Sequence, residues 1–403
     1  MKTAEQSAEA LLLADQIINA VTDVLPKNIE VFPLHEPFFG GNEWRYVKEC
    51  IDTGWVSSLG KYVDRFEQDL AAYTGAKYAV VTVNGTAALH MCLHLAGVVQ
   101  DDEVLVPALS FVATANAVAY CGAVPHFVDS EEDSLGLDPL KLADYLSGIA
   151  EARSGSCWNL NTGRRIAAVV PMHTFGHPVD MDPLLEICAK LGVVVVEDAA
   201  ESLGSFYKGK HTGNFGLLSC LSFNGNKIVT TGGGGAILTN NAELAATAKH
   251  ITTTAKTPHK WHYVHNRVGY NYRLPNISSA LGCAQLERIL EFVERKRQLA
   301  SRYRDAFAGS DKADFFIEPD YAKSNYWLNA ILLKPEYVRH REELLARMHA
   351  QNILARPAWR LLNELPMFSD LPCMDLSTAI GLEKSILNLP SSVNLGSSAS
   401  ATV

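Results

Sequence analysis

Short apolar runs alternate with helix-like segments between about residues 77 and 240, and this alternation limits the folds open to the chain. Strands that are apolar on both faces belong inside a sheet that helices cover, as in mostly parallel sheets. The segments predicted as strands are 78–83, 104–107, 124–129, 166–171, 193–198, 217–223 and 236–239, with helices at 86–96, 111–120 and 183–191. The pattern predicts an α/β fold whose large domain contains a mainly parallel sheet.

A chain of 403 residues is too long for one compact core, so more than one domain is expected. Residues 1–30 are typical of an amphipathic helical extension, and residues 31–255 form the predicted large domain. The remainder, 256–403, is expected to contain a long functional loop and then a small C-terminal α+β domain. Its predicted elements are the loop at 257–273, one long helix at 277–308, a strand at 327–333 and a helix at 339–351.

Composition excludes several classes of protein. The net charge of −9 argues against a nucleic-acid-binding surface, which would be basic. No run of about 20 apolar residues is present, so no membrane span is expected. The eight cysteines form no CxxC pair and several lie in apolar runs, which favours buried thiols in a reducing, cytoplasmic compartment over a disulfide framework.

Two candidate catalytic residues follow buried strands. The run Val193–Val196 leads into Asp198, and burial there is costly for a carboxylate unless a cation or strong donors compensate. A helix N-cap is an equally open interpretation of Asp198. Lys227 follows the apolar segment 217–223, which argues against a fully exposed lysine. A strand-delivered aspartate and a strand-delivered lysine are what a pyridoxal phosphate (PLP) enzyme needs, as partner of the pyridinium nitrogen and as Schiff-base amine.

Four further residues have both an ordinary and a functional interpretation. Gly85 and Thr86 lie at a strand-to-helix turn, where free amides bind phosphate, although such turns are common. Phe111 could stack on a flat ring, although on local grounds a core phenylalanine is favoured. Glu201 could complete a capping box or reach a cofactor's phenolic oxygen.

Three motifs are misleading. The segment 204–210 matches most of a phosphate-binding P-loop, but His211 stands where Ser or Thr is required, so a hairpin-like turn is expected. The histidines 259, 262 and 265 have no cysteine or acidic neighbour, and no metal site is expected there. The glycine run 232–235 lacks the strand–helix setting of a dinucleotide site.

Taken in order, the motifs resemble the DegT/DnrJ/EryC1/StrS family of PLP-dependent sugar aminotransferases over about residues 31–392. The segments that carry the resemblance are Leu34-His35-Glu36-Pro37, Gly54-Trp55-Val56-Ser57-Ser58-Leu59-Gly60, Val63-Asp64-Arg65-Phe66-Glu67, Asn84-Gly85-Thr86-Ala87-Ala88-Leu89, Phe111, Glu197-Asp198-Ala199-Ala200, Ser222-Phe223-Asn224-Gly225-Asn226-Lys227 and Gly269-Tyr270-Asn271-Tyr272-Arg273. Each match alone is weak, whereas the ordered set is specific. One departure is Gly233, where many relatives have a glutamate.

The resemblance implies the fold of type I (aspartate aminotransferase-like) PLP transferases and assigns a role to each matching residue. Lys227 would carry the cofactor and shuttle protons, and Asp198 would keep the pyridine nitrogen protonated. The remaining cofactor residues would be Gly85, Thr86 and Ser222 on the phosphate, Asn271 on the phosphate from a partner subunit, Phe111 on the ring face and Glu201 near the phenolic oxygen. Ser57 and His173 would lie near the sugar.

The same resemblance implies transamination from L-glutamate to a nucleotide-linked keto-sugar, in deoxyamino-sugar and polysaccharide biosynthesis. The N-terminal extension and the Asn-Gly-Asn-Lys segment are similar to the subgroup that acts on UDP-linked 4-keto-6-deoxy-N-acetylhexosamines. The working unit would be a homodimer with shared active sites. Two alternatives are a sugar dehydratase of the same fold, in which histidine replaces the lysine, and a non-catalytic ligand-binding relative.

Overall fold

A central sheet forms the middle layer of the protein. The computed structural model describes residues 4–396, with side chains from residue 13 onward. The strand order is β1 (Tyr78–Thr82), β11 (Gly235–Thr239), β10 (Leu218–Ser222), β7 (Val194–Asp198), β6 (Arg165–Val169), β2 (Glu103–Pro107) and β3 (Val124–Val128), with a hairpin of β4 (Ala150–Arg153) and β5 (Ser156–Asn159) joined through β6. The strands from β10 to β3 pair in parallel, and β11 runs antiparallel to both β1 and β10.

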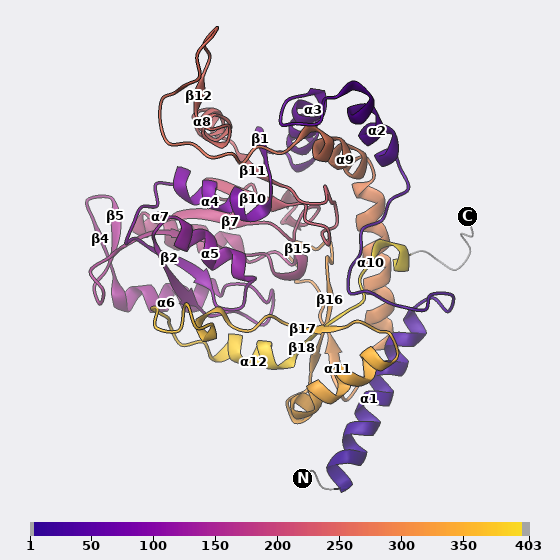
Figure 1. Ribbon diagram of the computed structural model, residues 1–403. Helices are drawn as coiled ribbons and strands as arrows, with labels where there is room; N and C mark the ends of the chain where they lie inside the picture. Colours follow the sequence, from indigo (N-terminus) through magenta and orange to yellow (C-terminus); the bar gives the residue numbers. More distant parts are fainter. Residues whose placement is uncertain (1–3, 397–403) are drawn as a thin grey trace.

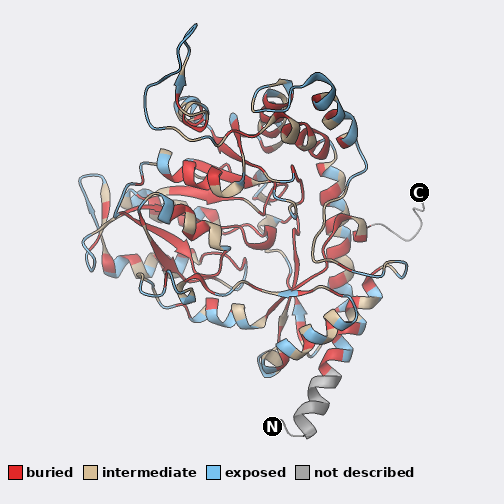
Figure 2. Ribbon diagram, viewed as in Figure 1, coloured by how far each residue is buried: buried red, intermediate tan, exposed pale blue. Residues whose placement is uncertain are grey.

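Helices cover both faces of this sheet (Figure 1). Along β2, Val104 and Val106 belong to one core cluster while Leu105 belongs to another on the opposite face. The first cluster is covered by α4 (Gly85–Leu95), α5 (Val112–Tyr120) and α8 (Ala242–Thr252); the opposite face is covered by α6 (Pro139–Ile149), α7 (Met181–Leu191), α3 (Lys61–Thr74) and α9 (Asn276–Leu286). Because alternate side chains enter different cores, the strands need apolar residues on both faces. Figure 2 shows these strands buried along most of their length.

A second, smaller sheet lies in the C-terminal part of the chain. Its strands are β14 (Ala313–Phe315), β16 (Asn329–Leu333), β18 (Ile386–Leu389) and β17 (Arg356–Pro357), paired antiparallel in that order. Around it lie α10 (Ile289–Ala306), α11 (Arg341–Ala350), α12 (Ser377–Ser385) and α1 (Ala4–Val24) (Figure 1). Buried side chains of α1 share a core with α10, α11 and this sheet. The proposed division at residues 30 and 255 stays a prediction.

The predicted helix at 277–308 is wrong as a single element, because α9 and α10 are separate. Arg288 interrupts it with φ −111° and ψ 6°. Glu287 is held there by the Tyr46 hydroxyl at 2.7 Å and the Arg65 guanidinium at 2.6 Å, both from α2 (Glu43–Thr53) and α3. No glycine or proline occurs at this break, so it originates in tertiary packing.

Other expectations are confirmed. The segment that resembles a P-loop forms a hairpin of β8 (Phe206–Tyr207) and β9 (Lys210–His211). The loop 257–273 is largely irregular, with a short pairing of β12 (Lys256–Thr257) and β13 (Val264–His265) and isolated bridges at Asn271 and Arg273, and it projects beyond α8 (Figure 1). All eight cysteines are free. Between residues 4 and 396 no helix is both long and apolar enough to cross a bilayer.

The N-terminal helix predicts a stability test. Ile17 on α1 is 1% exposed among the residues of the C-terminal core. Ile17→Ala should destabilise the protein by about 2–4 kcal/mol, because it leaves a cavity in that core. Denaturant unfolding measures the loss. The matched change Gln16→Ala, at an exposed position of the same helix, should alter stability by less than about 0.5 kcal/mol. Equal effects of the two changes would contradict the packing described.

Candidate active site

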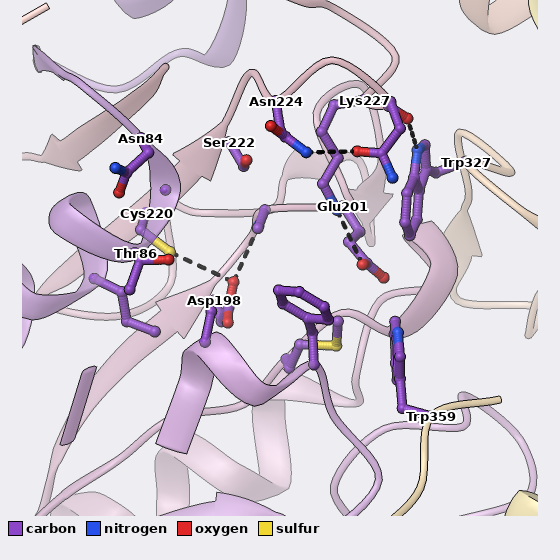
Figure 3. A pocket seen from close by; sticks show the side chains of 17 residues that line it. Asn84, Thr86, Asp198, Glu201, Cys220, Ser222, Asn224, Lys227, Trp327 and Trp359 are labelled. Atoms are coloured by element: carbon purple, nitrogen blue, oxygen red, sulfur yellow. Dashed lines mark hydrogen bonds and ion pairs between the residues drawn. The ribbon is translucent and has the colours of Figure 1, made fainter. Parts of the chain in front are cut away.

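The carboxyl ends of β1, β7 and β10 open into a cavity of about 300 Å³ (Figure 3). Parallel strands present their carboxyl ends at one edge of a sheet, which is where α/β proteins bind ligands. The lining residues are Asn84, Gly85, Thr86, Leu89, Phe111, Ala113, Met172, Asp198, Ala200, Glu201, Cys220, Ser222, Asn224, Asn226, Lys227, Trp327 and Trp359. The cavity therefore brings together the following predicted site residues: Gly85, Thr86, Phe111, Asp198, Glu201, Ser222 and Lys227.

Asp198 lies at the inner end of this cavity and is 5% exposed. The Thr114 hydroxyl donates to its Oδ2 at 2.8 Å, and the Ala200 amide donates to Oδ1 at 3.2 Å. No helix begins after Asp198, so the N-cap interpretation is wrong. Among residues 4–396 no lysine, arginine or histidine forms an ion pair with it. A buried carboxylate in this state favours a cationic ligand.

Lys227 extends into the cavity from the turn after β10, and its side chain is 12% exposed. Its Nζ donates to Glu201 Oε1 at 3.0 Å (Figure 3). The same Nζ lies 3.7 Å from the centroid of the Trp327 ring, within the range of a cation–π interaction. The apolar segment before Lys227 thus leads to a partly enclosed amine, as expected.

Glu201 accepts hydrogen bonds at both oxygens, because the Phe175 amide donates to Oε2 at 3.0 Å. It forms no capping box, since no helix starts here. Burial raises the pKa of Glu201 to about 7, against the opposing effect of the Lys227 ammonium. Phe175 holds its amide in place from a left-handed backbone conformation, φ +55°, which is costly for a non-glycine residue and recurs at functional sites.

The first turn of α4 also lines the cavity. The Asn84 side chain accepts from the Ala87 amide at 2.7 Å, while the amides of Gly85 and Thr86 lie in the turn where no intrahelical acceptor exists. A Cβ at Gly85 would lie 2.8 Å from Ser222 Cβ, so only glycine allows this approach. Gly235 is constrained in the same way by Asn84 O, at 2.5 Å from its Cβ position.

Three predicted residues lie outside this cavity. His173 is fully buried; its Nδ1 accepts from the Val179 amide and its Nε2 lies 3.2 Å from Glu197 Oε2, so both ring nitrogens are engaged away from the cavity. Ser57 is exposed in the loop between α2 and α3. Asn271 is also exposed, beside Thr253, and its proposed reach into a partner subunit stays a prediction.

Two tryptophans were not predicted as site residues. Trp327 and Trp359 come from the C-terminal part of the chain, and they form one wall of the cavity (Figure 3). Trp359 packs on Phe175 at 4.9 Å and on Phe111 at 6.3 Å between ring centroids. In the sequence both tryptophans stand in apolar segments that resemble core. The only hint in the sequence that they line a site is the residue type, because a buried tryptophan has a polar N–H that usually finds a hydrogen-bond partner.

These residues fit PLP. A buried carboxylate without a cationic partner suits a protonated pyridine nitrogen, a helix start with a close-approach glycine suits a phosphate, and a lysine amine lines the same cavity. A metal is not suggested, since no cluster of three or more potential ligands occurs in the part of the chain that is described.

The fold and this site together define a fold-type I PLP enzyme. The sequence matches the model of the DegT/DnrJ/EryC1/StrS aminotransferase family over residues 39–403. The chain belongs to this family and is a PLP-dependent aminotransferase.

Several of its relatives are named for nucleotide-linked sugars. GDP-perosamine synthase from Vibrio cholerae is 35% identical, over 90% of this chain and 94% of that protein. UDP-4-amino-4,6-dideoxy-N-acetyl-beta-L-altrosamine transaminase from Campylobacter jejuni is 34% identical, over 75% of this chain and 76% of that protein. The solved aminotransferase PseC of Helicobacter pylori, involved in pseudoaminic acid biosynthesis, superposes with a TM-score of 0.81 at 25% identity, over 90% and 94% of the two chains.

The raised pKa of Glu201 predicts a pH-dependent stability difference from Glu201→Gln. The folded carboxyl keeps its proton up to about pH 7, whereas the unfolded one loses it near 4.5. The unfolded state therefore binds fewer protons between these values, and the wild-type protein should lose stability relative to the variant as pH rises through this window. Urea unfolding of cofactor-free protein at several pH values measures this. Parallel stability curves would contradict the assignment.

Gly85 predicts a binding defect without loss of the fold. Gly85→Ala places a methyl group against Ser222 and should weaken PLP binding by about tenfold or more, since the cradle must open. Fluorescence or absorbance titration of the cofactor-free protein measures the affinity. Gly148→Ala is the control, because a Cβ there meets nothing within 4 Å in α6. Equal PLP affinity in the two variants would argue against a phosphate site at Gly85.

Proposed function

We propose that the protein transfers the amino group of L-glutamate to the ketone of a UDP-linked 4-keto-6-deoxy amino sugar. The observation that carries this proposal is one cavity that contains the Lys227 amine, the buried Asp198 carboxylate and the free first turn of α4. Membership of a sugar aminotransferase family supports the reaction class, and the substrate names of its relatives support a nucleotide-linked sugar.

Each side chain has a defined task in this proposal. Gly85, Thr86 and Ser222 bind the phosphate through amides and hydroxyls. Asp198, oriented by the Thr114 hydroxyl, keeps a proton on the pyridine nitrogen. PLP supplies an electron-withdrawing ring that stabilises negative charge at the substrate carbon. The Lys227 amine would carry a proton between that carbon and the C4′ carbon of the cofactor.

The surroundings of the cavity support a sugar as acceptor. Phe111, Trp327 and Trp359 offer flat apolar faces, which suit the C–H face of a deoxyhexose, while Asn224 and Asn226 offer amide groups to hydroxyls. The C. jejuni relative is named for a UDP-linked dideoxy-N-acetyl sugar and the V. cholerae relative for a GDP-linked one. We choose UDP because the N-terminal extension and the segment 224–227 resemble the UDP-sugar subgroup.

A homodimer with shared active sites is part of the same proposal. Large apolar side chains are exposed on α2, on the loop that follows it and on the projecting loop: Trp44, Trp55, Leu59, Trp261, Tyr263 and Val268. A monomer seldom exposes so many large apolar groups, and a partner subunit would cover them. The eight free cysteines support a cytoplasmic location. A dehydratase is disfavoured because Lys227 is present, and a non-catalytic relative because the cavity residues are intact.

Replacing Lys227 tests the catalytic assignment. Lys227→Ala and Lys227→Arg should each abolish turnover and the visible absorbance of PLP-loaded protein, because the amine is the covalent partner and the proton carrier. Stopped-flow spectra and product analysis measure both. Lys190→Ala, at an exposed lysine of α7, is the control and should keep full activity. A fully active Lys227→Ala protein would refute the proposed role.

A substrate panel separates the finer alternatives. The yellow PLP-loaded protein should lose its colour with L-glutamate and regain it with the accepted keto-sugar. UDP-, GDP- and dTDP-linked 4-keto-6-deoxy sugars, with and without an N-acetyl group, form the panel. We expect the UDP-linked N-acetyl sugar to give the highest kcat/KM. A preference for the GDP-linked sugar would overturn the nucleotide assignment and leave the reaction class intact, whereas no colour change with any donor would favour a binding protein.

A further inference from the structure

The Lys227 ammonium is enclosed by two unlike groups. Glu201 Oε1 lies 3.0 Å from Nζ on one side, and the indole face of Trp327 lies 3.7 Å from it on the other. Above the Glu201 pKa of about 7 the carboxylate supplies a full negative charge, and the aromatic face supplies the attraction of its quadrupole, which is strengthened where water is scarce. Trp327 is 4% exposed, so water has little access to that face. We name Glu201 and Trp327 the lysine cradle.

One short segment, residues 324–327, holds both halves of the cradle. Trp327 Nε1 donates to Asn226 O at 2.8 Å and so fastens the turn that carries Lys227. The Asn325 side-chain amide donates to the carbonyl of Glu201 at 2.9 Å. Its Oδ1 accepts from the Trp327 amide at 2.7 Å, which links the two anchors to each other. The distance between the carboxylate and the indole is thereby fixed from outside the large sheet.

The segment itself is rigidly supported. The fully buried Lys296 of α10 donates to Trp327 O at 3.0 Å, and Leu328 N donates to Phe175 O. Tyr326 and Phe175 both have left-handed backbone conformations, φ +48° and +55°. A left-handed conformation is unfavourable for a non-glycine residue, and such strain recurs at functional sites. Here one strained residue lies beside each half of the cradle.

We propose that Trp327 is a positioning residue for Lys227: with Glu201 it holds the ε-ammonium at a fixed place while this amine is not bonded to the cofactor or substrate. The proposal rests on the role proposed for Lys227. An amine that leaves and returns once per half-reaction otherwise explores many rotamers, and each return costs conformational entropy. A cradle next to the reaction centre removes most of that freedom.

The other charged groups around Lys227 do not replace the cradle. Asp198 is oriented by Thr114 and Ala200 at the inner end of the cavity. Burial, followed by the charges of Lys296 and Lys227, lowers the pKa of His35 well below its ordinary value, so its ring is neutral and does not compete for Glu201. Burial also lowers the pKa of Lys296, whose amine donates to backbone carbonyls.

The first experiment uses cofactor-free protein. A small amine-reactive reagent is applied at constant pH, and peptide mass spectrometry gives the labelling rate of Lys227 relative to the exposed Lys190. Trp327→Leu should raise this ratio by about fivefold and Trp327→Phe by about twofold, because phenyl keeps a smaller π face and lacks the bond to Asn226. The control is Trp158→Leu, a half-buried tryptophan of β5 remote from the cavity, which should leave the ratio unchanged. An unchanged ratio in whichever Trp327 variant folds overturns the proposal.

The second experiment uses PLP-loaded protein. Trp327→Leu should lower kcat by about tenfold and change KM for L-glutamate by less than about twofold, since the change affects the return of the amine and not donor binding. If Trp327 had a purely structural role, kcat would fall only in proportion to the loss of correctly folded enzyme. The labelling ratio of Lys227 in the folded variant would then stay unchanged.

The two proposals fail in different ways. Borohydride reduction of PLP-loaded wild-type protein followed by peptide mapping shows whether Lys227 carries the cofactor. Modification at another lysine would overturn the role of Lys227 and with it the proposed function. Modification at Lys227 together with an unchanged labelling ratio in the Trp327 variants would overturn only the cradle.

Discussion

The antiparallel position of β11 between β1 and β10 is the constraint on which the site depends. Because β11 reverses direction between them, β1 and β10 point the same way as β7. The three strand ends therefore meet at one edge, with the turn to α4, Asp198 and Ser222 adjacent there. A register error of one residue in β7 would turn Asp198 to the opposite face of the sheet, so the pairing register of β7 with its neighbours also directs this carboxylate into the cavity.

The site concentrates polar groups where the rest of the sheet is apolar. The free-energy cost of burying these carboxyl groups is offset locally by donors with fixed geometry: the Thr114 hydroxyl for Asp198 and the Phe175 amide for Glu201. The glycines Gly85 and Gly235 allow backbone contacts that a side chain would prevent. The same preorganisation that satisfies these groups in the protein makes them ready for a ligand that carries opposite charges.

Much of the fold and part of the site could be predicted from local sequence. Apolar runs locate the parallel strands, because both faces are buried, and the runs before Asp198 and Lys227 point to the buried carboxylate and the partly enclosed amine that the structure shows. The partners of Lys227 are harder to predict from the sequence. Glu201 fits either a capping box or a cofactor contact, and Trp327 lies 100 positions further along the chain in a segment that resembles an ordinary strand. The break at Arg288 and the burial of His173 away from the cavity likewise depend on tertiary contacts, which leave no periodic signal.

The core shared by α1 and β18 has a consequence for biosynthesis. Leu13 and Ile17 belong to the same core as Leu387, Leu389 and Leu395, so α1 is synthesised long before much of the core that covers it. During elongation all strands of the large sheet are synthesised while the apolar face of α1 still lacks the α10, α11 and β18 residues of its core. Nascent chains that stop before about residue 386 would therefore expose part of this apolar surface, and exposed apolar surface is what chaperones bind.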